Sequence, residues 1–183
     1  MTGPADRGDL PRRLNLGSGL KKRADCLNVD RRGEPDLVCD LDQRPWPLPR
    51  DHFEHVYALD VVEHLASVQG FMEEVHAVLA PGGVVEITTP HFSSANSFTD
   101  PTHRHHLGYF SFDYFTDASQ WSFYTDVRFA MVERTLVFHQ RLADRPIARF
   151  ANRHPMLWEQ RFAWLWPAWF LIFKLRAVKG PAA

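Results

Sequence analysis

The chain has 183 residues, a length that corresponds to about one domain around a single hydrophobic core. Its 45% hydrophobic and 23% charged residues exclude intrinsic disorder of the whole chain. The 21 Lys and Arg nearly balance the 22 Asp and Glu, and the net charge of -1 argues against a dedicated nucleic-acid-binding protein. Cys26 and Cys39 form neither a disulfide framework nor a Cys-x-x-Cys zinc pair, so a reducing, cytoplasmic location is expected.

The N-terminal segment and the longest uncharged stretch both argue against a membrane-spanning protein. Residues 1–12 are polar and rich in Gly, Pro, Asp and Arg, so we expect a loose N-terminal arm rather than a secretory signal. Residues 162–173 are uncharged but only twelve in number, whereas a spanning helix needs about 20 apolar residues. We therefore expect no transmembrane segment.

Short apolar runs alternate with a helical pattern in the first half of the chain, the order of elements from which a parallel sheet is built. Predicted strands, each followed by a polar residue, a glycine or a proline, span residues 13–16, 26–29, 37–39, 55–59 and 84–89. Residues 45–49 contain three prolines and are therefore a loop. Apolar residues recur at helical spacing from Val68 to Leu79, which predicts a helix with one apolar stripe against the sheet.

The second half of the chain is less regular. Residues 91–126 are rich in Ser, Asn, Thr, His and aromatic residues, and we expect an insertion without long elements there. Residues 128–139 and 168–178 alternate as strands that can pair antiparallel, and residues 141–166 between them form a predicted helical insertion. The sequence therefore predicts one α/β domain over all 183 residues, with a doubly wound, mostly parallel sheet and an antiparallel C-terminal edge strand.

Candidate ligand-binding residues follow the first three predicted strands, at the edge where an open parallel sheet binds its ligands. A Gly-Ser-Gly turn at residues 17–19 lets the backbone approach a ligand closely, because glycine has no Cβ. Asp30 after the second strand can accept hydrogen bonds from both hydroxyls of a ribose, and Asp40 after the third can accept one from an adenine amine. Each feature alone is equally an ordinary turn or a solvated strand end, but the three in order favour a ligand site.

These residues and several further segments resemble the class I S-adenosylmethionine-dependent methyltransferases, above all their small bacterial members. The matching segments read LNLGSG at 14–19, NVD at 28–30, DL at 40–41, PLP at 47–49, ALDVVEHL at 58–65 and LAPGG at 79–83, with fainter matches at 100–103 and in the terminal strand pair. The resemblance implies a Rossmann-like methyltransferase fold and S-adenosylmethionine as cofactor. The cofactor-binding residues that it implies are Asn15, Gly17, Ser18, Gly19, Asp30, Asp40, Leu41, Leu59 and Asp60.

The resemblance also implies a role for each part of this set. The glycine turn would lie under the methionine part of the cofactor, and Asp30 would hold the ribose. Asp40 and Leu41 would hold the adenine, whereas Leu59 and Asp60 would border the sulfonium.

The chain departs from the family pattern at the first turn. Asn15 stands where the family often has an acid, and it brings no charge to the cofactor's amino group. Only eleven positions separate Gly19 from Asp30, so the helix that normally follows the glycine turn is itself reduced to a turn. Both departures keep a non-catalytic or regulatory protein that binds S-adenosylmethionine or S-adenosylhomocysteine as an alternative. Lys22 occupies the position where a dinucleotide-binding turn needs its third glycine, which disfavours NAD or FAD.

Histidines are the candidate catalytic residues. Methyl transfer to a hydroxyl, amine or carbon of a small molecule requires a positioned acceptor and, for a hydroxyl, a base that takes its proton. We predict His103 as this base, His91 as the second candidate, and His64 as part of the lining of the methyl-transfer pocket. Each of them can instead be a polar loop residue with ordinary hydrogen bonds.

A metal centre is a third possibility for the histidine-rich loop. Asp100, His103, His105 and His106 supply suitable ligand types, which would make the protein a His-rich metalloenzyme on the same scaffold. Their spacing matches no described zinc pattern, and adjacent histidines on a strand point in opposite directions. We therefore expect no metal site.

The aromatic residues of the C-terminal third leave the choice of partner open. Residues 162–173 can be buried core, the seam of a homodimer or a surface that touches a membrane. We expect a small-molecule methyl acceptor and no nucleic acid. Residues 91–126 on the acceptor side and the C-terminal aromatic residues decide which acceptor binds, and no spacing in the sequence identifies it.

Overall fold

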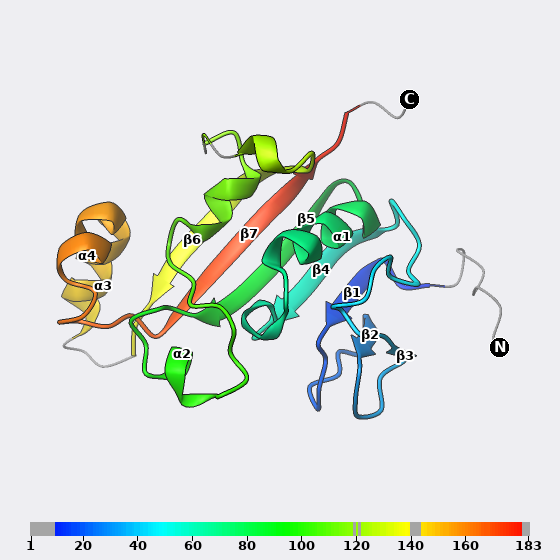
Figure 1. The fold of residues 1–183 in the computed structure, drawn as a ribbon, viewed down its shortest axis with the longest axis horizontal. Helices are drawn as coiled ribbons and strands as arrows, with labels where there is room; N and C mark the ends of the chain where they lie inside the picture. Colours follow the sequence, from blue (N-terminus) through cyan, green and yellow to red (C-terminus); the bar gives the residue numbers. More distant parts are fainter. Residues whose placement is uncertain (1–9, 119, 121, 140–143, 181–183) are drawn as a thin grey trace.

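The structure is a computed structural model that describes residues 10–118, 120, 122–139 and 144–180, so most of the predicted N-terminal arm lies outside the described residues. A seven-stranded sheet runs through the described chain in the order β3-β2-β1-β4-β5-β7-β6 (Figure 1). Neighbouring strands are parallel except at β7, which is antiparallel to both β5 and β6. The strands are β1 (Arg13–Leu16), β2 (Leu27–Asp30), β3 (Leu37–Val38), β4 (Phe53–Leu59), β5 (Leu79–Pro90), β6 (Arg128–Val137) and β7 (Phe170–Val178).

The strand order confirms the predicted α/β fold and corrects the place of its antiparallel strand. The C-terminal strand β7 is antiparallel, as predicted, but it lies between β5 and β6, and β6 forms the edge. Burial explains this order. Alternate residues of β7 from Leu171 to Ala177 are buried, whereas Ala130, Val132 and Glu133 of β6 are exposed. The more exposed strand takes the edge position.

Helix α1 (Val68–Val78) lies across one face of the sheet, as predicted (Figure 1). Ser67 caps its N-terminus, and the Ser67 hydroxyl accepts a hydrogen bond of 3.0 Å from the Gly70 amide. The stripe of Phe71, Met72 and Val75 is buried in the core with the alternate buried residues of β4, β5 and β7. Strand β5 begins directly after the helix and is therefore longer than predicted.

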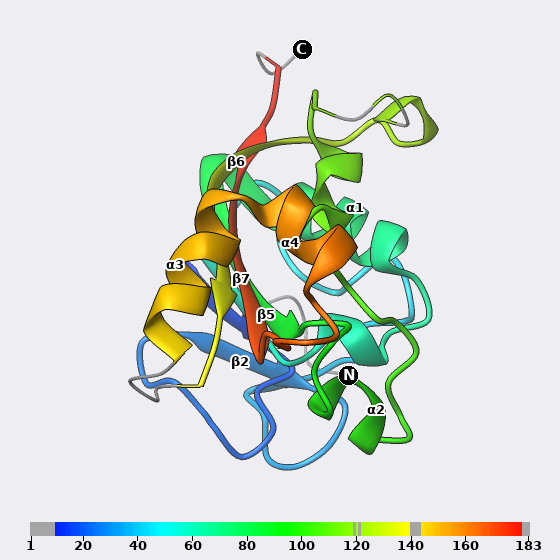
Figure 2. The same cartoon turned by 90° about the vertical axis from the view of Figure 1, so that its left-hand side faces the viewer.

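The helices that a doubly wound sheet carries over its first strands are reduced to turns. Within the described residues no helix joins β1 to β2 or β2 to β3, and the short spacing after β1 predicts the first of these turns. Helices α3 and α4 stand at one end of the sheet, beyond β6 and β7 (Figure 1, Figure 2). No helix in the described part of the chain is both long and apolar enough to cross a membrane. The remaining helices are η1 (Val62–His64), α2 (Asn96–Thr99), η2 (Ser111–Phe115), η3 (Ser122–Tyr124), α3 (Asp144–Arg153) and α4 (Pro155–Arg161).

A polar network holds β1, β2 and the turn between them in place of a helix. The buried Asn15 donates from Nδ2 to Asn28 Oδ1 at 3.0 Å and to the Lys21 carbonyl at 3.2 Å. Asn28 donates through its backbone amide and through Nδ2 to Asp36 Oδ2, at 2.9 and 2.7 Å. Asp36 also forms an ion pair of 2.7 Å with Lys22. These contacts fix the path of the turn, whose own backbone hydrogen bonds include those from the Lys21 amide to the Ser18 carbonyl and from the Cys26 amide to the Arg23 carbonyl.

The Asp36 carboxyl makes this network sensitive to acid. Hydrogen bonds from Lys22 and Asn28 lower the pKa of Asp36 from 3.8 to about 2. Because the folded-state pKa lies below the unfolded-state value, the stabilisation from Asp36 is complete above about pH 4 and is lost as the pH falls toward about 2. We expect Asp36→Asn to lower the Tm near neutral pH by about 2–4 °C and to weaken the acid dependence of the Tm, measured by calorimetry.

Glu34, which like Asp36 is an exposed carboxylate between β2 and β3, provides the matched control. Glu34→Gln should keep the wild-type Tm and its acid dependence. If Asp36→Asn and the wild type lose Tm in parallel between about pH 4 and about pH 2, the network does not depend on the Asp36 charge.

Candidate active site

Two cavities adjoin at the carboxyl edge of the parallel strands. The first, of about 270 Å³, is lined by Gly17, Asp30, Arg31, Cys39, Asp40, Leu41, Asp42, Asp60, Val61, His64, Leu65 and Thr102. The second, of about 560 Å³, is lined by Asp60, Glu63, His64, Pro90, Asn96, Thr99, Asp100, Pro101, His103 and Phe170. Asp60 and His64 belong to both walls, so the cavities meet at these two residues.

The glycine turn after β1 packs closely against the segment after β4. Gly17 and Gly19 have φ angles of 63° and 49°, in the left-handed region that favours glycine. A Cβ atom at Gly17 would lie 2.4 Å from Val61 Cγ2. Position 17 therefore requires glycine both for its backbone conformation and for the space beside it.

Backbone amides orient the carboxylates of the first cavity. Asp30 Oδ2 accepts a hydrogen bond of 2.8 Å from the Gly19 amide, and Asp30 Oδ1 accepts one of 2.9 Å from the Arg32 amide. Each carboxylate oxygen can accept a further hydrogen bond, so both hydroxyls of a ribose can bind to Asp30. Asp40 Oδ1 is oriented in the same way by the Asp42 amide at 3.1 Å.

The structure brings five of the nine predicted cofactor-binding residues to the first cavity, namely Gly17, Asp30, Asp40, Leu41 and Asp60. The other four do not line it. Asn15 is engaged in the network behind the turn, and Gly19 contributes its amide to Asp30. Ser18 is buried, and its hydroxyl has no hydrogen-bond partner among the described residues. Leu59 is half-buried at the end of β4.

Asp60 occupies the point where the two cavities meet. Its φ of 60° is uncommon for a residue with a Cβ atom. The Asp60 amide donates to the Thr88 carbonyl at 3.0 Å, and Asp60 Oδ1 accepts from the Thr88 hydroxyl at 2.9 Å. Strand β5 thus holds a strained residue in one orientation at the shared wall.

A carboxyl group and two imidazoles meet in the second cavity. Glu63, in η1, is only 1% exposed, and its Oε2 has no hydrogen-bond partner within the described chain. Burial raises the pKa of Glu63 from 4.5 to about 7. Glu63, His64 and His103 each place one nitrogen or oxygen atom within 4.8 Å of the other two. The arrangement can exchange a proton near neutral pH or hold a metal ion.

Hydrogen bonds decide which nitrogen of each imidazole is available. His103 Nδ1 lies 3.1 Å from the Ser97 carbonyl, which can only accept, so Nδ1 carries the proton. His64 Nδ1 lies 2.9 Å from the Thr102 hydroxyl, whose own proton is donated to Asp100 Oδ1 at 2.7 Å. Burial, together with the neighbouring His103, lowers the pKa of His64. In its neutral form, each ring therefore presents an unprotonated Nε2.

The structure does not bring His91, the second predicted base, to either cavity. The ring is 0% exposed, and His91 lines neither wall. His91 Nε2 lies 3.0 Å from Glu159 Oε1 of α4, and Nδ1 lies 2.8 Å from the Ser93 hydroxyl. The Ser93 amide donates to the same Nδ1, so the ring proton is on Nε2 and is donated to Glu159. His91 thus joins the end of β5 to α4 and has no access to a ligand.

The histidines after α2 are not gathered as the metal-ligand set that their types suggest. His105 Nε2 lies 2.9 Å from the Leu65 carbonyl, whereas His106 Nδ1 lies 2.8 Å from the Ser97 hydroxyl. His106 also stacks on Phe98. Among the described residues, the group that can hold a metal ion is instead formed by Glu63, His64 and His103.

Sequence reasoning missed Glu63, which lines the second cavity together with His64 and His103. A carboxyl residue directly after Val61 and Val62 is the signal that could have identified it, since charged residues are seldom fully buried without a partner. Phe170 was missed as well, because its place in the wall depends on how β7 pairs with β5. No local pattern carries that information.

The first cavity fits the nucleoside part of a cationic cofactor. Asp30, Asp40, Asp42 and Asp60 bring four carboxylates to its wall, against the one guanidinium of Arg31. This excess of negative charge suits a sulfonium and an amino group. The strand order, with β7 antiparallel next to the edge, and an acidic cavity at the carboxyl ends of the parallel strands are the features of a Rossmann-like methyltransferase fold.

A sequence profile described as a methyltransferase domain matches residues 21–166, and the chain belongs to this family. By this membership the protein is a methyltransferase. A search of curated protein sequences finds no match.

Solved structures share the fold at low sequence identity. An S-adenosylmethionine-dependent methyltransferase from Mesorhizobium loti has a TM-score of 0.58 at 18% identity, and 91% of each chain is covered. A methyltransferase from Archaeoglobus fulgidus has a TM-score of 0.56 at 16% identity, over 92% of this chain and 86% of that one. The 1,6-didemethyltoxoflavin-N1-methyltransferase of Burkholderia thailandensis, solved with 1,6-didemethyltoxoflavin and S-adenosylhomocysteine bound, has a TM-score of 0.53 at 12% identity, over 91% and 71%.

The geometry of Asp30 predicts its contribution to cofactor binding. Removal of a carboxylate that accepts from two ribose hydroxyls should weaken the binding of S-adenosylhomocysteine by about tenfold or more. We expect this loss for Asp30→Ala in titration calorimetry. Glu34→Ala, which removes an exposed carboxylate outside the cavity, should bind like the wild type. Equal affinity of Asp30→Ala and wild type for S-adenosylhomocysteine would show that Asp30 does not bind the ribose.

Proposed function

We propose that the enzyme transfers the methyl group of S-adenosylmethionine to a hydroxyl, amine or carbon of a small molecule bound in the second cavity. One observation carries this proposal: the two cavities share Asp60 and His64 as common wall residues. A donor in the first cavity and an acceptor in the second would therefore meet at this boundary, as an in-line displacement requires.

The residues of the first cavity would hold the cofactor in parts. Asp30 would accept from the ribose, and Asp40 with the Leu41 amide would bind the adenine. The glycine turn would admit the methionine portion, with Gly19 and Ser18 acting through the backbone. Asp60 would border the sulfonium from the shared wall. The bound cofactor supplies an electrophilic methyl group that already carries its leaving group.

His103 is the proposed base for a hydroxyl or amine acceptor. Its Nδ1 proton is donated to the Ser97 carbonyl, which leaves Nε2 to accept the proton of the acceptor. His64 would line the transfer path, held by Thr102 and Asp100. Glu63 lies within reach of both imidazoles and would increase their basicity when ionised.

A second candidate mechanism uses a divalent cation at the same cluster. Glu63, His64 and His103 offer one carboxylate and two imidazoles, a donor set found in several metal sites. A cation there would bind the acceptor oxygen and favour its ionised form. This version makes turnover sensitive to a chelator, whereas catalysis by His103 alone is not.

Cytoplasmic location forms part of the proposal. Cys26 and Cys39 are both buried free thiols, which suits a reducing compartment.

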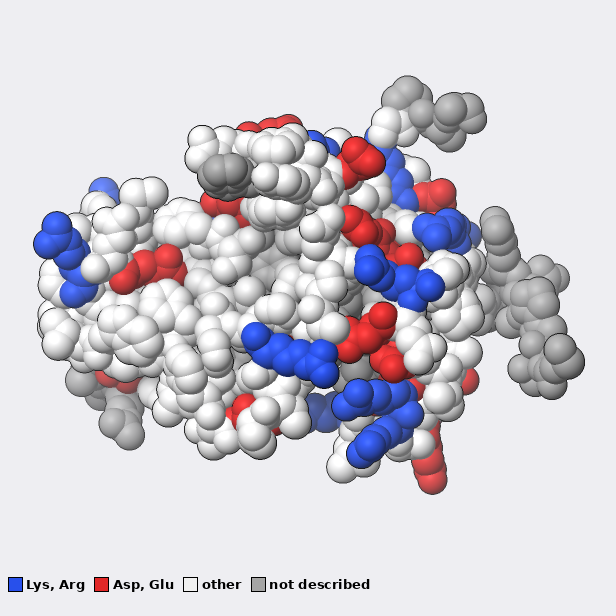
Figure 3. Space-filling model, in the orientation of Figure 1, with Lys and Arg blue, Asp and Glu red and all other residues white. Residues whose placement is uncertain are grey.

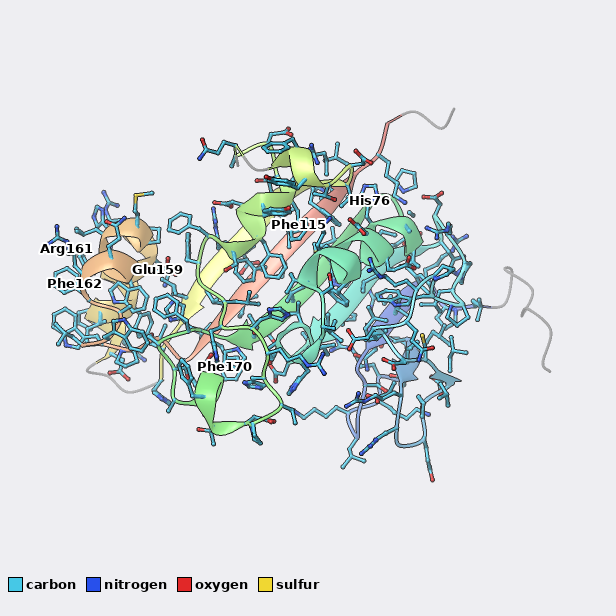
Figure 4. The ribbon with its side chains drawn as sticks, in the orientation of Figure 1. His76, Phe115, Glu159, Arg161, Phe162 and Phe170 are labelled. Atoms are coloured by element: carbon cyan, nitrogen blue, oxygen red, sulfur yellow. The ribbon has the colours of Figure 1, made fainter. Side chains whose placement is uncertain are left out.

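The first functional test is a screen of hydroxyl, amine and carbon acceptors for formation of S-adenosylhomocysteine. With an active acceptor, His103→Ala should lower kcat by about 10²- to 10⁴-fold, the usual effect of losing a general base. Its affinity for S-adenosylhomocysteine should stay within about twofold of the wild type, because His103 does not line the first cavity. His76→Ala, at the opposite end of the sheet, is the control (Figure 4).

Three outcomes separate the mechanisms. Full activity of His103→Ala would contradict its role as base. Loss of wild-type turnover with EDTA, restored by a divalent cation, would favour the metal-assisted version. Cofactor binding without turnover on any acceptor would count against small-molecule methyl transfer.

Glu63 should destabilise the folded protein at neutral and alkaline pH. Its folded-state pKa of about 7 lies above the usual value of 4.5, so the folded state retains a proton that the unfolded state has lost. The stability contributed by the protonated carboxyl is full below about pH 4.5 and declines as the pH rises to about 7 and beyond. We expect Glu63→Gln to raise the Tm at about pH 8 by several degrees, with a smaller effect at about pH 5.

The comparison needs thermal unfolding of both proteins across this range. Asp113→Asn, which breaks a half-buried ion pair with Arg134, is a control that should lower the Tm rather than raise it. Parallel pH profiles of Glu63→Gln and wild type would show that burial does not perturb Glu63.

A further inference from the structure

The end of the molecule beyond β6 and β7 carries a cluster of exposed apolar side chains. Helix α4 and the segment that follows it project from the sheet at the left of Figure 1. Trp164 and Leu165 are 68% and 70% exposed, the highest values in this cluster. We call the cluster the apolar tip, and it consists of Met156, Leu157, Trp164, Leu165, Trp166 and Trp169.

The apolar tip is held rigidly because its inner side is part of the core. Trp158 of α4 is 0% exposed, and its ring lies 5.2 Å from His91 and 5.4 Å from Phe138 between centroids. On the outer side, the rings of Phe162 and Trp166 stack at 5.4 Å. One tryptophan thus anchors the segment while others remain outside. The outer side chains are presented on a preformed surface rather than on a loose loop.

Exposed basic side chains lie on α3 and α4, at the same end of the molecule as the apolar tip. Arg145, Arg149 and Arg153 of α3 and Arg161 of α4 are all exposed. None of them forms an ion pair with a carboxylate of the described chain. Glu159, the acidic residue of α4, is engaged inward with His91 and the Tyr109 amide. Figure 3 shows blue basic side chains at this end, and Figure 4 places Arg161 at its outer side.

We propose that the apolar tip docks on a membrane surface that carries anionic lipid headgroups. Tryptophan favours the boundary between headgroups and acyl chains, where its ring is partly in apolar surroundings and its N–H remains hydrated. Arginines beside it are attracted by anionic headgroups. No described helix is long and apolar enough to span a bilayer. The proposed contact is therefore peripheral, with the apolar tip at the membrane surface.

Charge argues against a second copy of the chain as the occupant. A two-fold symmetric dimer built on the apolar tip would gather the exposed α3 and α4 arginines of both copies, Arg149, Arg153 and Arg161 among them, at one end of each molecule. Glu159 is committed to His91 and gives these arginines no partner. An anionic surface complements the same set without repulsion.

The second cavity lies close to the foot of the apolar tip. Phe170, the first residue of β7, lines that cavity. It directly follows Trp169 of the apolar tip in the chain. Figure 4 shows Phe170 between α4 and α2. If the proposed acceptor site is correct, docking places it beside the lipid surface, which suits an amphiphilic acceptor. The docking itself does not depend on that site.

Sedimentation with vesicles tests the docking without any acceptor or turnover. The full chain is mixed with vesicles of phosphatidylcholine alone or of phosphatidylcholine with phosphatidylglycerol. We expect binding to the anionic vesicles at least about tenfold stronger than to the neutral ones, decreasing as salt screens the charges. The double variant Trp164→Ser with Leu165→Ser should lose about tenfold or more in binding, and so should Arg153→Glu with Arg161→Glu.

Controls change one exposed apolar residue and one exposed basic residue elsewhere. Val38 is 69% exposed on β3 at the other side of the sheet, and Arg50 is exposed ahead of β4. Val38→Ser and Arg50→Glu should bind vesicles like the wild type. All variants should retain the wild-type Tm within about 2 °C and the wild-type affinity for S-adenosylhomocysteine, because the changed residues are exposed and outside the first cavity.

Three results would overturn the proposal. The first is failure of the wild type to bind anionic vesicles, and the second is equal binding by the tip variants and the wild type. The third is a concentration-dependent dimer in light scattering that Trp164→Ser with Leu165→Ser abolishes, which would assign the apolar tip to self-association. If the wild type binds anionic vesicles but turns over no acceptor, the result counts against the proposed function and not against docking on the membrane.

Discussion

The hydrogen bond between the side chains of Asn15 and Asn28 holds the cofactor edge of this sheet together. It belongs to a network that stands in place of a helix over β1 and β2 and that continues through Asp36 to Lys22. The glycine turn and Asp30 occupy their positions because the strands that lead to them are held at this register. A buried amide pair of this kind stabilises only when every polar group is satisfied, so the geometry is specified narrowly.

Unlike the Asn15–Asn28 network, the buried Glu63 lowers the stability of the fold and contributes to the chemistry of the second cavity. A carboxyl with an unpartnered oxygen in the interior costs free energy in its charged form. A carboxyl that retains a proton near neutral pH is, however, a useful proton donor or acceptor, and so the destabilised group stands beside two imidazoles. The strained backbone of Asp60 lies three residues earlier in the same segment. Strain and desolvation are thus concentrated where the two cavities meet.

Much of the fold and part of the site follow from local sequence patterns. The strands and α1 are predictable because alternation and helical spacing are local, and Asp30 and Asp40 are predictable because parallel strands end at one edge. The roles of the histidines are not local. His91 Nε2 is occupied by a hydrogen bond to Glu159, which is 68 residues away in the chain. His103 Nε2 is left to act as an acceptor because Nδ1 donates to a carbonyl only six residues away. The edge position of β6 likewise depends on pairing with a strand that comes later.

The shared wall formed by Asp60 and His64 links the two cavities thermodynamically. Val61 lies between these residues and packs beside Gly17, so the same short segment contacts the glycine turn and forms part of the walls of both cavities. A ligand in either cavity that orders this segment lowers the entropic cost for the other ligand, and the two affinities must change by the same factor. Under the proposed function, departure of one product would then lower the affinity of the other cavity for its own product, so that release of one favours release of the other.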